Sequence, residues 1–82
     1  MIELHKYLRE KGFVCSYRNA DRASFWKSTE IPYYWQIDLD GSWIKVTKFS
    51  NEDIKFSELC LQNAQVSSIA ELAVIIEILN IR

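Results

Sequence analysis

Few side chains in this 82-residue chain have the chemistry of a catalytic centre. The single histidine, His5, falls in a segment that we expect to be helical, and no pattern places it beside Cys15, Cys60 or a serine, as nucleophilic catalysis requires. We therefore expect His5 on the surface of its helix. The two cysteines lie far apart in the sequence, and we expect both to be buried as free thiols that pack like small apolar side chains.

The other groups that could act as acids, bases or ligands are acidic pairs in turn-like positions. Asp38 with Asp40, and Glu52 with Asp53, stand where acidic residues favour turns for backbone reasons. The chain has two glycines, both at cap or turn positions, which leaves no phosphate-cradling loop. One histidine and no closely spaced cysteines leave no zinc-ligand set. We expect a protein that is not an enzyme and that needs neither cofactor nor metal.

The composition is typical of one globular domain over residues 1–82. Hydrophobic residues make up 49% of the chain and aromatic residues 13%, enough to build a core in a domain this small. Lys and Arg number 10 against 11 Asp and Glu, so the net charge is −1. Domains that bind a nucleic-acid backbone usually carry a basic excess, so this balance disfavours non-specific duplex binding.

The hydropathy pattern contains no membrane-spanning segment. The longest uninterrupted apolar stretch, Leu72–Ile76, is far shorter than the roughly 20 residues that cross a bilayer. The start of the chain also lacks the basic region and apolar run of a secretion signal. We expect no membrane association and a cytoplasmic protein, which also argues against a disulfide.

The two ends of the chain have helical periodicity. Apolar residues of Ile2–Lys11 fall on one face, and Gly12 follows where a left-handed residue often ends a helix. Near the other end, Ser68 and Glu71 form the pattern of a capping box, which predicts a helix over Ile69–Asn80. The inner stripe of that helix is predicted to be Ile69, Leu72, Ala73, Ile76 and Leu79.

Between the helices the pattern is typical of strands. A bulge or a change to helix is expected between Ser57 and Leu59, and Gln62–Ser67 is expected to be a connection. We predict an α+β fold of two layers, in which a meander of four or five antiparallel strands has the N- and C-terminal helices on one face. The predicted strands are Phe13–Arg18, Ala23–Lys27, Tyr33–Leu39, Ser42–Phe49 and Ile54–Leu61.

The clearest local signal is a hairpin centred on Asp40-Gly41, a dipeptide that favours a two-residue type I′ turn. A four-residue loop after the hairpin would place Glu58 opposite Lys45. The turn predicts that Leu39 pairs with Ser42, Ile37 with Ile44, Trp35 with Val46 and Tyr33 with Lys48, on one mostly apolar face.

The opposite face of the hairpin is the first candidate surface. It carries Tyr34, Trp43, Lys45 and Thr47 and is expected to meet water, because both helices cover the other face. Tyr and Trp are enriched at protein interfaces. Two interpretations fit: the aromatic side chains bind a partner, or they only cover neighbouring backbone within the sheet.

The predicted C-terminal helix is the second candidate surface. Val74 and Ile78 lie nearly opposite its inner stripe, with Ile81 close by if the helix continues. A helix that is apolar all round is usually buried on more than one side. Either the first helix covers these side chains, or they contact another chain, which would be a copy of this one or a different protein.

The sequence supports two hypotheses of function. The first is a protein-interaction module, including a self-associating homodimer, that acts as a small regulator or inhibitor of bacterial or mobile-element type. The second is single-stranded nucleic-acid binding on the same sheet face, with Tyr34 and Trp43 stacking on bases and Lys45, with Lys27 or Lys48 nearby, contacting phosphates. A basic groove beside Trp43 would favour nucleic acid, and an apolar patch would favour a protein partner.

Overall fold

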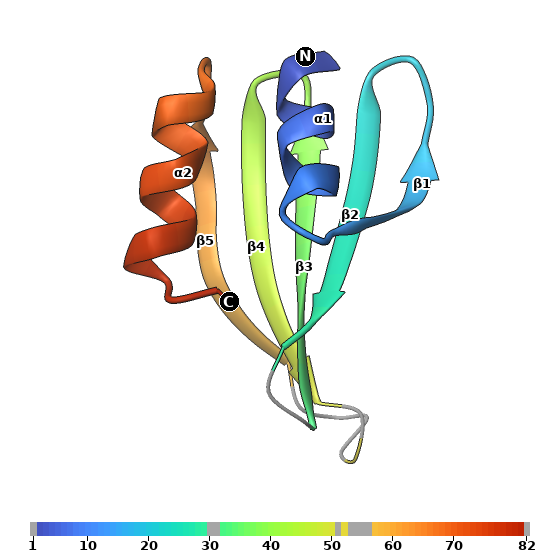
Figure 1. Cartoon of the computed structure of the whole chain (residues 1–82), viewed down its shortest axis with the longest axis vertical. Helices are drawn as coiled ribbons and strands as arrows, with labels where there is room; N and C mark the ends of the chain where they lie inside the picture. Colours follow the sequence, from blue (N-terminus) through green and yellow to red (C-terminus); the bar gives the residue numbers. More distant parts are fainter. Residues whose placement is uncertain (1, 30–31, 51, 53–56, 82) are drawn as a thin grey trace.

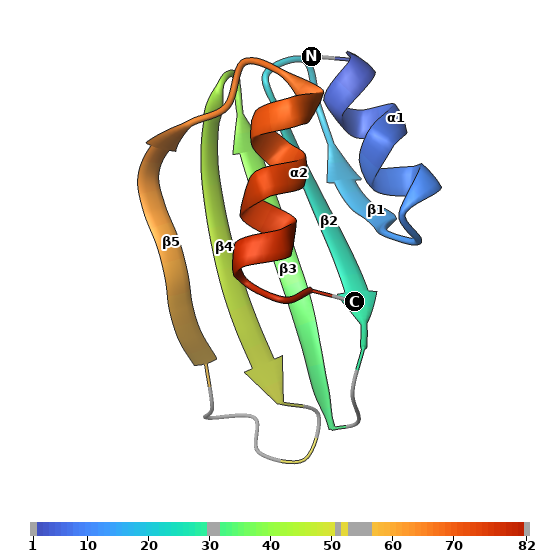
Figure 2. The ribbon, with the colours of Figure 1, turned by 60° about the vertical axis from the view of Figure 1, so that its left-hand side comes forward.

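The computed structural model describes residues 2–29, 32–50, 52 and 57–81, which form a sheet layer and a helix layer (Figure 1). Each strand pairs antiparallel with its neighbour in the sequence, so the sheet is a five-stranded meander. Both helices lie on the same face (Figure 2), which confirms the predicted α+β fold. The elements are α1 (Ile2–Glu10), β1 (Val14–Arg18), β2 (Arg22–Ser28), β3 (Tyr33–Asp40), β4 (Trp43–Ser50), β5 (Ser57–Gln65) and α2 (Ile69–Ile78).

The core lies between the two helices and the inner face of the sheet. Alternate side chains of β2, β3 and β4 point into it, and Phe25, Ile37 and Val46 are fully buried there. Leu8 of α1 and Leu72 of α2 close it from the helix side and are also fully buried. The apolar face that the alternation in the hairpin predicts is therefore confirmed.

The β3–β4 hairpin keeps its predicted faces but not its predicted pairs. Asp40 pairs with Trp43, so the two-residue turn is Gly41-Ser42 rather than Asp40-Gly41, and the predicted register is wrong by two residues. Gly41 has a φ of 58°, and glycine at the first central position is typical of a type II′ turn. Because side chains alternate with a period of two, the shift leaves every side chain on its predicted face.

β5 is longer and less regular than expected. It continues to Gln65, so the connection expected over Gln62–Ser67 is wrong up to that residue, while residues 54–56 of the expected strand lie outside the described residues. The polar side chains of this stretch are compatible with a strand because β5 is an edge strand whose outer side meets water. Edge position, which the sequence does not reveal, explains the difference.

Two bulges interrupt the pairing of β5 with β4. Cys60 is the extra residue of the first, just beyond the stretch where an irregularity is predicted, and the second includes Asn63, which has a φ of 56°. Glu58 faces Lys48 because the first pair after the connection is Phe49 with Ser57, so the predicted pair of Glu58 with Lys45 is wrong.

α1 ends where the sequence predicts, at a left-handed glycine. Gly12 has a φ of 93°, and the Phe13 N–H donates to the Leu8 carbonyl at 2.9 Å, as in a Schellman motif. The side chains of Leu8 and Phe13 are both buried in the core. Lys27 of β2 adds a second cap, because its Nζ donates to the Lys11 carbonyl at 2.7 Å.

α2 begins at the predicted capping box. The Ser68 hydroxyl accepts a hydrogen bond from the Glu71 N–H at 3.2 Å, and the Glu71 carboxylate accepts one from the Ser67 hydroxyl at 2.7 Å. Leu72 confirms the predicted inner stripe, but Ile69 is 41% exposed and does not belong to it.

The chain reverses directly after α2. Asn80 adopts a φ of 59°, and the Ile81 N–H donates to the Ile76 carbonyl at 3.0 Å, which makes a second Schellman motif with asparagine in place of glycine. Ile81 therefore turns back into the core and is buried. The sequence places Ile81 beside Val74 and Ile78 only if the helix continues, and the helix ends at Ile78.

The two cysteines lie on the two edge strands. Cys15 of β1 and Cys60 of β5 are free and half-buried, less covered than expected. Four strand spacings of about 4.8 Å separate their strands, far beyond the roughly 7 Å that a disulfide can bridge between Cα atoms. Within the described residues, the structure contains no helix with the length and apolarity to cross a membrane.

The left-handed residue after α2 provides a test of the fold. Asn80→Val should lower the free energy of unfolding by about 1–2 kcal/mol, because a β-branched side chain is strained at positive φ. Asn80→Gly should not lower it, since glycine adopts this conformation without strain. Urea denaturation of the two variants measures both effects, and equal losses would contradict the role given to Asn80.

Candidate functional site

The sheet has one face without helix cover, and we call it the outer face (Figures 1 and 2). Side chains at alternate positions of all five strands point to it, since residues paired across neighbouring strands share a face. The outer face divides along the strands into an apolar part near the ends of β2 and β4 and a polar part near the Gly41-Ser42 turn. The two parts differ in what they can bind.

The apolar part is a band to which every strand contributes one large side chain. The Trp26 and Tyr34 rings meet edge to face with centroids 6.4 Å apart, and Tyr34 stacks on Phe49 at 5.2 Å. Val14 extends the band onto β1 and Leu59 extends it onto β5. Trp26, Val14 and Leu59 are all exposed, at 39%, 51% and 47%. We call these five residues the aromatic band.

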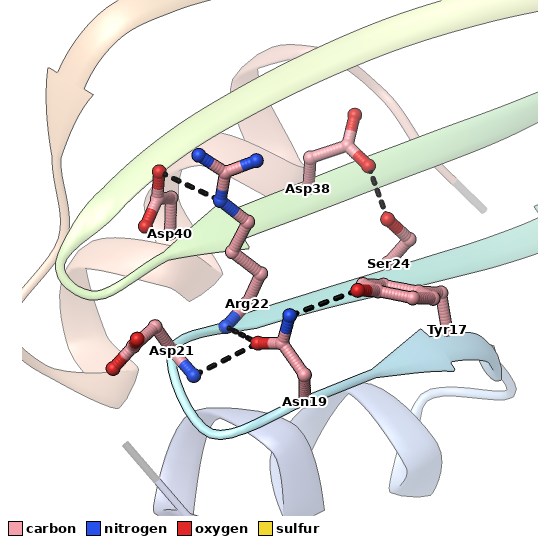
Figure 3. Close-up of polar contacts among 7 residues, drawn as sticks. All are labelled: Tyr17, Asn19, Asp21, Arg22, Ser24, Asp38 and Asp40. Atoms are coloured by element: carbon pink, nitrogen blue, oxygen red, sulfur yellow. Dashed lines mark hydrogen bonds and ion pairs between the residues drawn. The ribbon is translucent and has the colours of Figure 1, made fainter.

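The polar part is a network of hydrogen bonds around Asp38 and Asp40 (Figure 3). The Ser24 hydroxyl donates to the Asp38 carboxylate at 2.6 Å, and the Gln36 amide donates to it at 3.1 Å. Arg22 forms an exposed ion pair with Asp40 at 3.3 Å. Asp38 is therefore held in place by neutral donors.

An Asx turn fixes the β1–β2 connection beside this network. The Asn19 side-chain oxygen accepts from the N–H groups of Asp21 and Arg22 at 2.9 and 2.8 Å, and its amide donates to the Tyr17 hydroxyl at 2.8 Å (Figure 3). Tyr17 and Trp43 stand on opposite sides of a shallow hollow of about 480 Å³ whose floor includes Asp38. The hydrogen-bonded β1–β2 connection thus borders the polar part on its β1 side.

The charges of the outer face balance. Among its described residues, the cations are Arg22 and Lys45 and the anions are Asp38 and Asp40. No basic groove runs beside Trp43 in this part of the structure.

The other two lysines of the nucleic-acid hypothesis lie on the helix side of the sheet. Lys27 caps α1, and the Lys48 Nζ lies 4.5 Å from the centre of the Tyr33 ring and 5.4 Å from that of Trp35. The expectation that Lys27 or Lys48 stands near Lys45 is therefore wrong for both.

The predicted residues of the outer face share that face but do not form one cluster. Tyr34 belongs to the aromatic band, and Trp43, 50% exposed, belongs to the polar part with Lys45. Trp43 lies six residues along β4 from Phe49, the pairing partner of Tyr34, so about 20 Å separates the two predicted anchors. Thr47 lies between them and is only 8% exposed, which leaves little of its side chain to contact a partner.

Four members of the aromatic band are missing from the sequence-based prediction. Phe49 continues the alternation of Trp43, Lys45 and Thr47 by one step, so that signal was present. Val14 and Leu59 need the bulges of their edge strands to be placed, and Trp26 needs the β2–β3 register. Those features depend on long-range pairing.

The outward side of α2 is the second predicted surface. Val74 is 51% exposed and Ile78 is 75% exposed, so α1 does not cover them. They lie in the helix layer, on the opposite side of the molecule from the outer face (Figure 2). The two predicted surfaces are therefore separate, and α2 offers only a narrow apolar ridge.

His5 is more buried than expected for a residue on a helix surface. Its ring lies 5.3 Å from that of Phe25, and its Nδ1 is buried with no hydrogen-bond partner among the described residues. Burial, with a smaller effect from the positive charge of Arg18, lowers the pKa of His5 below its ordinary 6.5. The fold therefore holds the neutral imidazole against the sheet.

Neither a cluster of metal ligands among the described residues nor a comparison with known proteins assigns a function. Within residues 2–29, 32–50, 52 and 57–81, no three His, Cys, Asp or Glu side chains gather as ligands for a metal ion. Comparison with protein-family models, curated proteins and solved structures finds no significant match to this chain. The outer face and the exposed side of α2 are therefore the features of the molecule that bear on its function.

The partly buried imidazole of His5 makes folding stability depend on pH. The unfolded chain protonates His5 near pH 6.5 and the folded protein only at lower pH, so folding stability falls as the pH drops below about 6.5. The melting temperature should therefore decrease between about pH 7.5 and about pH 5.5, and His5→Gln should make that decrease smaller. Thermal unfolding followed by circular dichroism measures the melting temperature at each pH. An equal decrease in the wild-type chain and in His5→Gln would exclude this role for His5.

Proposed function

We propose that this protein is a non-enzymatic protein-interaction module that binds through its outer face. The aromatic band carries the proposal. Strands of a sheet with one face in water normally carry polar side chains on that face. On the outer face, however, every strand contributes a large apolar side chain. Contiguous exposed apolar surface of this kind is characteristic of binding sites.

The arrangement around the band supports a protein as the ligand. Protein interfaces combine an apolar centre rich in aromatic residues with a polar rim that carries hydrogen bonds and a few charges. On the outer face the aromatic band is the apolar centre, and the network of Asp38, Asp40 and Arg22 is the polar rim. Trp43 adds an exposed aromatic side chain within the polar part, where a partner could cover it.

Single-stranded nucleic acid is the less favoured ligand of the same face. Base stacking needs free aromatic faces beside a groove of excess positive charge. Tyr34 and Phe49 already stack on each other, and the two cations of this face are matched by two carboxylates. A chain of this size with such a surface fits a cytoplasmic regulator or inhibitor that acts by occupying the surface of another protein.

Site-specific photo-crosslinking tests the proposal. A photoreactive amino acid at Leu59, in the aromatic band, should give a protein adduct in cells of the native host, because that side chain is exposed where the partner binds. The same amino acid at Glu10, exposed on α1, is the matched control and should give none. Adducts at Glu10 but not at Leu59 would contradict binding through the outer face.

Truncation of Trp43 separates binding from folding. Trp43→Ala should leave the circular dichroism spectrum and the melting temperature nearly unchanged, since the side chain is half exposed, but should reduce the yield of the Leu59 adduct. If Trp43→Ala instead unfolds the protein, Trp43 is a structural residue and does not act as an anchor.

The nucleic-acid alternative has its own readout. Trp26 and Trp43 lie on the outer face, so stacking of bases on this face would quench tryptophan fluorescence. We expect no quenching by pyrimidine oligonucleotides at low salt. Quenching that weakens as salt rises would contradict the proposal and establish single-stranded nucleic acid as the ligand.

A further inference from the structure

Both free edges of the sheet are unsuited to binding another strand. β1 contains a bulge at Ser16, and β5 contains the two bulges at Cys60 and Asn63. Bulges break the regular row of N–H and C=O groups that an added strand needs, and natural sheets use them to protect their edges. Association through this sheet is therefore left to the outer face.

We propose that the outer face packs against the same face of a second copy of this chain, so that two sheets form a two-fold symmetric sandwich. The inference rests on the proposed function and names the partner. Two sheets that pack face to face lie about 10 Å apart with their strands rotated by about 30°. The two helix layers then form the outside of the dimer.

The charges of the outer face favour its own copy over a strongly charged partner. Among the described residues, Arg22 and Lys45 balance Asp38 and Asp40. A face with no net charge meets an identical face without overall repulsion, whereas a markedly acidic or basic partner would find no complementary field.

The size of the face matches what a stable dimer needs. It is five strands wide and, in β3 and β4, 8 residues long. At about 4.8 Å between strands and about 3.3 Å per residue, this is about 20 Å by 26 Å before the side chains at the rim are counted. An interface of standard size buries about 800 Å² on each partner, and a corrugated face of this extent supplies surface of that order.

The side chains of the outer face have shapes that fit those of a second copy. A two-fold axis that lies between the sheets, about 15° from β3 so as to give the rotation of about 30°, places β2 of one copy roughly over β4 of the other and β1 roughly over β5. The large exposed ring of Trp26 then lies over the small, covered Thr47, and Val14 lies over Leu59. Large side chains thus face small ones on either side of the axis, and apolar ones face apolar ones at the edges. The residues of β3 lie near the axis and face their own copies, with Arg22 and Lys45 of the flanking strands beside Asp40 and Asp38.

Sedimentation over a wide range of concentration tests for the dimer. The wild-type chain should sediment as a dimer, and Leu59→Glu should raise the dissociation constant by about tenfold or more because it buries a charge in the apolar part. Ile78→Glu, on the far side of the molecule, is the matched control and should have no effect. Circular dichroism confirms that each variant is folded.

Two charge-reversal variants test the dimer with a result that unfolding of either variant could not produce. Arg22→Glu leaves the face with excess negative charge and Asp40→Lys leaves it with excess positive charge, so each variant alone should dimerise at least about tenfold more weakly. An equimolar mixture of the two should recover the dimer, because opposite faces then meet. Both residues are exposed and their ion pair contributes little to folding.

The outcomes separate this inference from the proposed function. A wild-type chain that is monomeric at all concentrations, or a dimer that Ile78→Glu disrupts and Leu59→Glu does not, overturns the face-to-face dimer. A monomer whose outer face still forms Trp43-dependent adducts at Leu59 leaves the proposed function standing with a different protein as partner. A monomeric chain that forms no such adducts overturns both the face-to-face dimer and the proposed function.

Discussion

Two short helices must cover one face of a sheet whose strands are much longer than they are. α1 has 9 residues and α2 has 10, about 14–15 Å of helix each, whereas the 8 residues of β3 and β4 span about 26 Å. The helices therefore close only part of the inner face, and the strands extend past them (Figure 1). At the uncovered end, Lys48 lies over the rings of Tyr33 and Trp35 and completes the layer with a cation–π contact.

This constraint also determines what the other face can do. With both helices used on the inner face, nothing within the described chain covers the outer one. Its polar part is compatible with water because hydrogen bonds satisfy its carboxylates. Its aromatic band has no such compensation, so it is the part of the outer face on which the proposed interaction rests.

The fold was largely predictable because its signals are local. Period-two alternation, the capping box of Ser68 and the glycine after the first helix each depend on a few adjacent residues, and all are confirmed. The turn position in the hairpin was not predictable from alternation, since a shift by two residues preserves both faces. The position of Ile81 depended on where α2 ends, and asparagine at the left-handed position is a weaker stop signal than glycine.

The candidate site was predictable only in part, because alternation is a local signal whereas register and bulges depend on long-range pairing. Tyr34 and Trp43 follow from alternation within one hairpin, but their separation along β4 follows from its register. The band joins residues from five strands, and two of its members are aligned by bulges that no short pattern in the sequence specifies. Likewise, His5 could be placed against Phe25 only once the packing of α1 on β2 was known.

The meander order has a consequence for how the chain folds. Every strand pairs with its sequence neighbour, so all the sheet pairings close short loops, and a low contact order of this kind is associated with fast folding. The packing of α1 beside α2 is different, because it joins the two ends of the chain. That contact therefore carries a larger loop-closure entropy than the pairing of any two neighbouring strands.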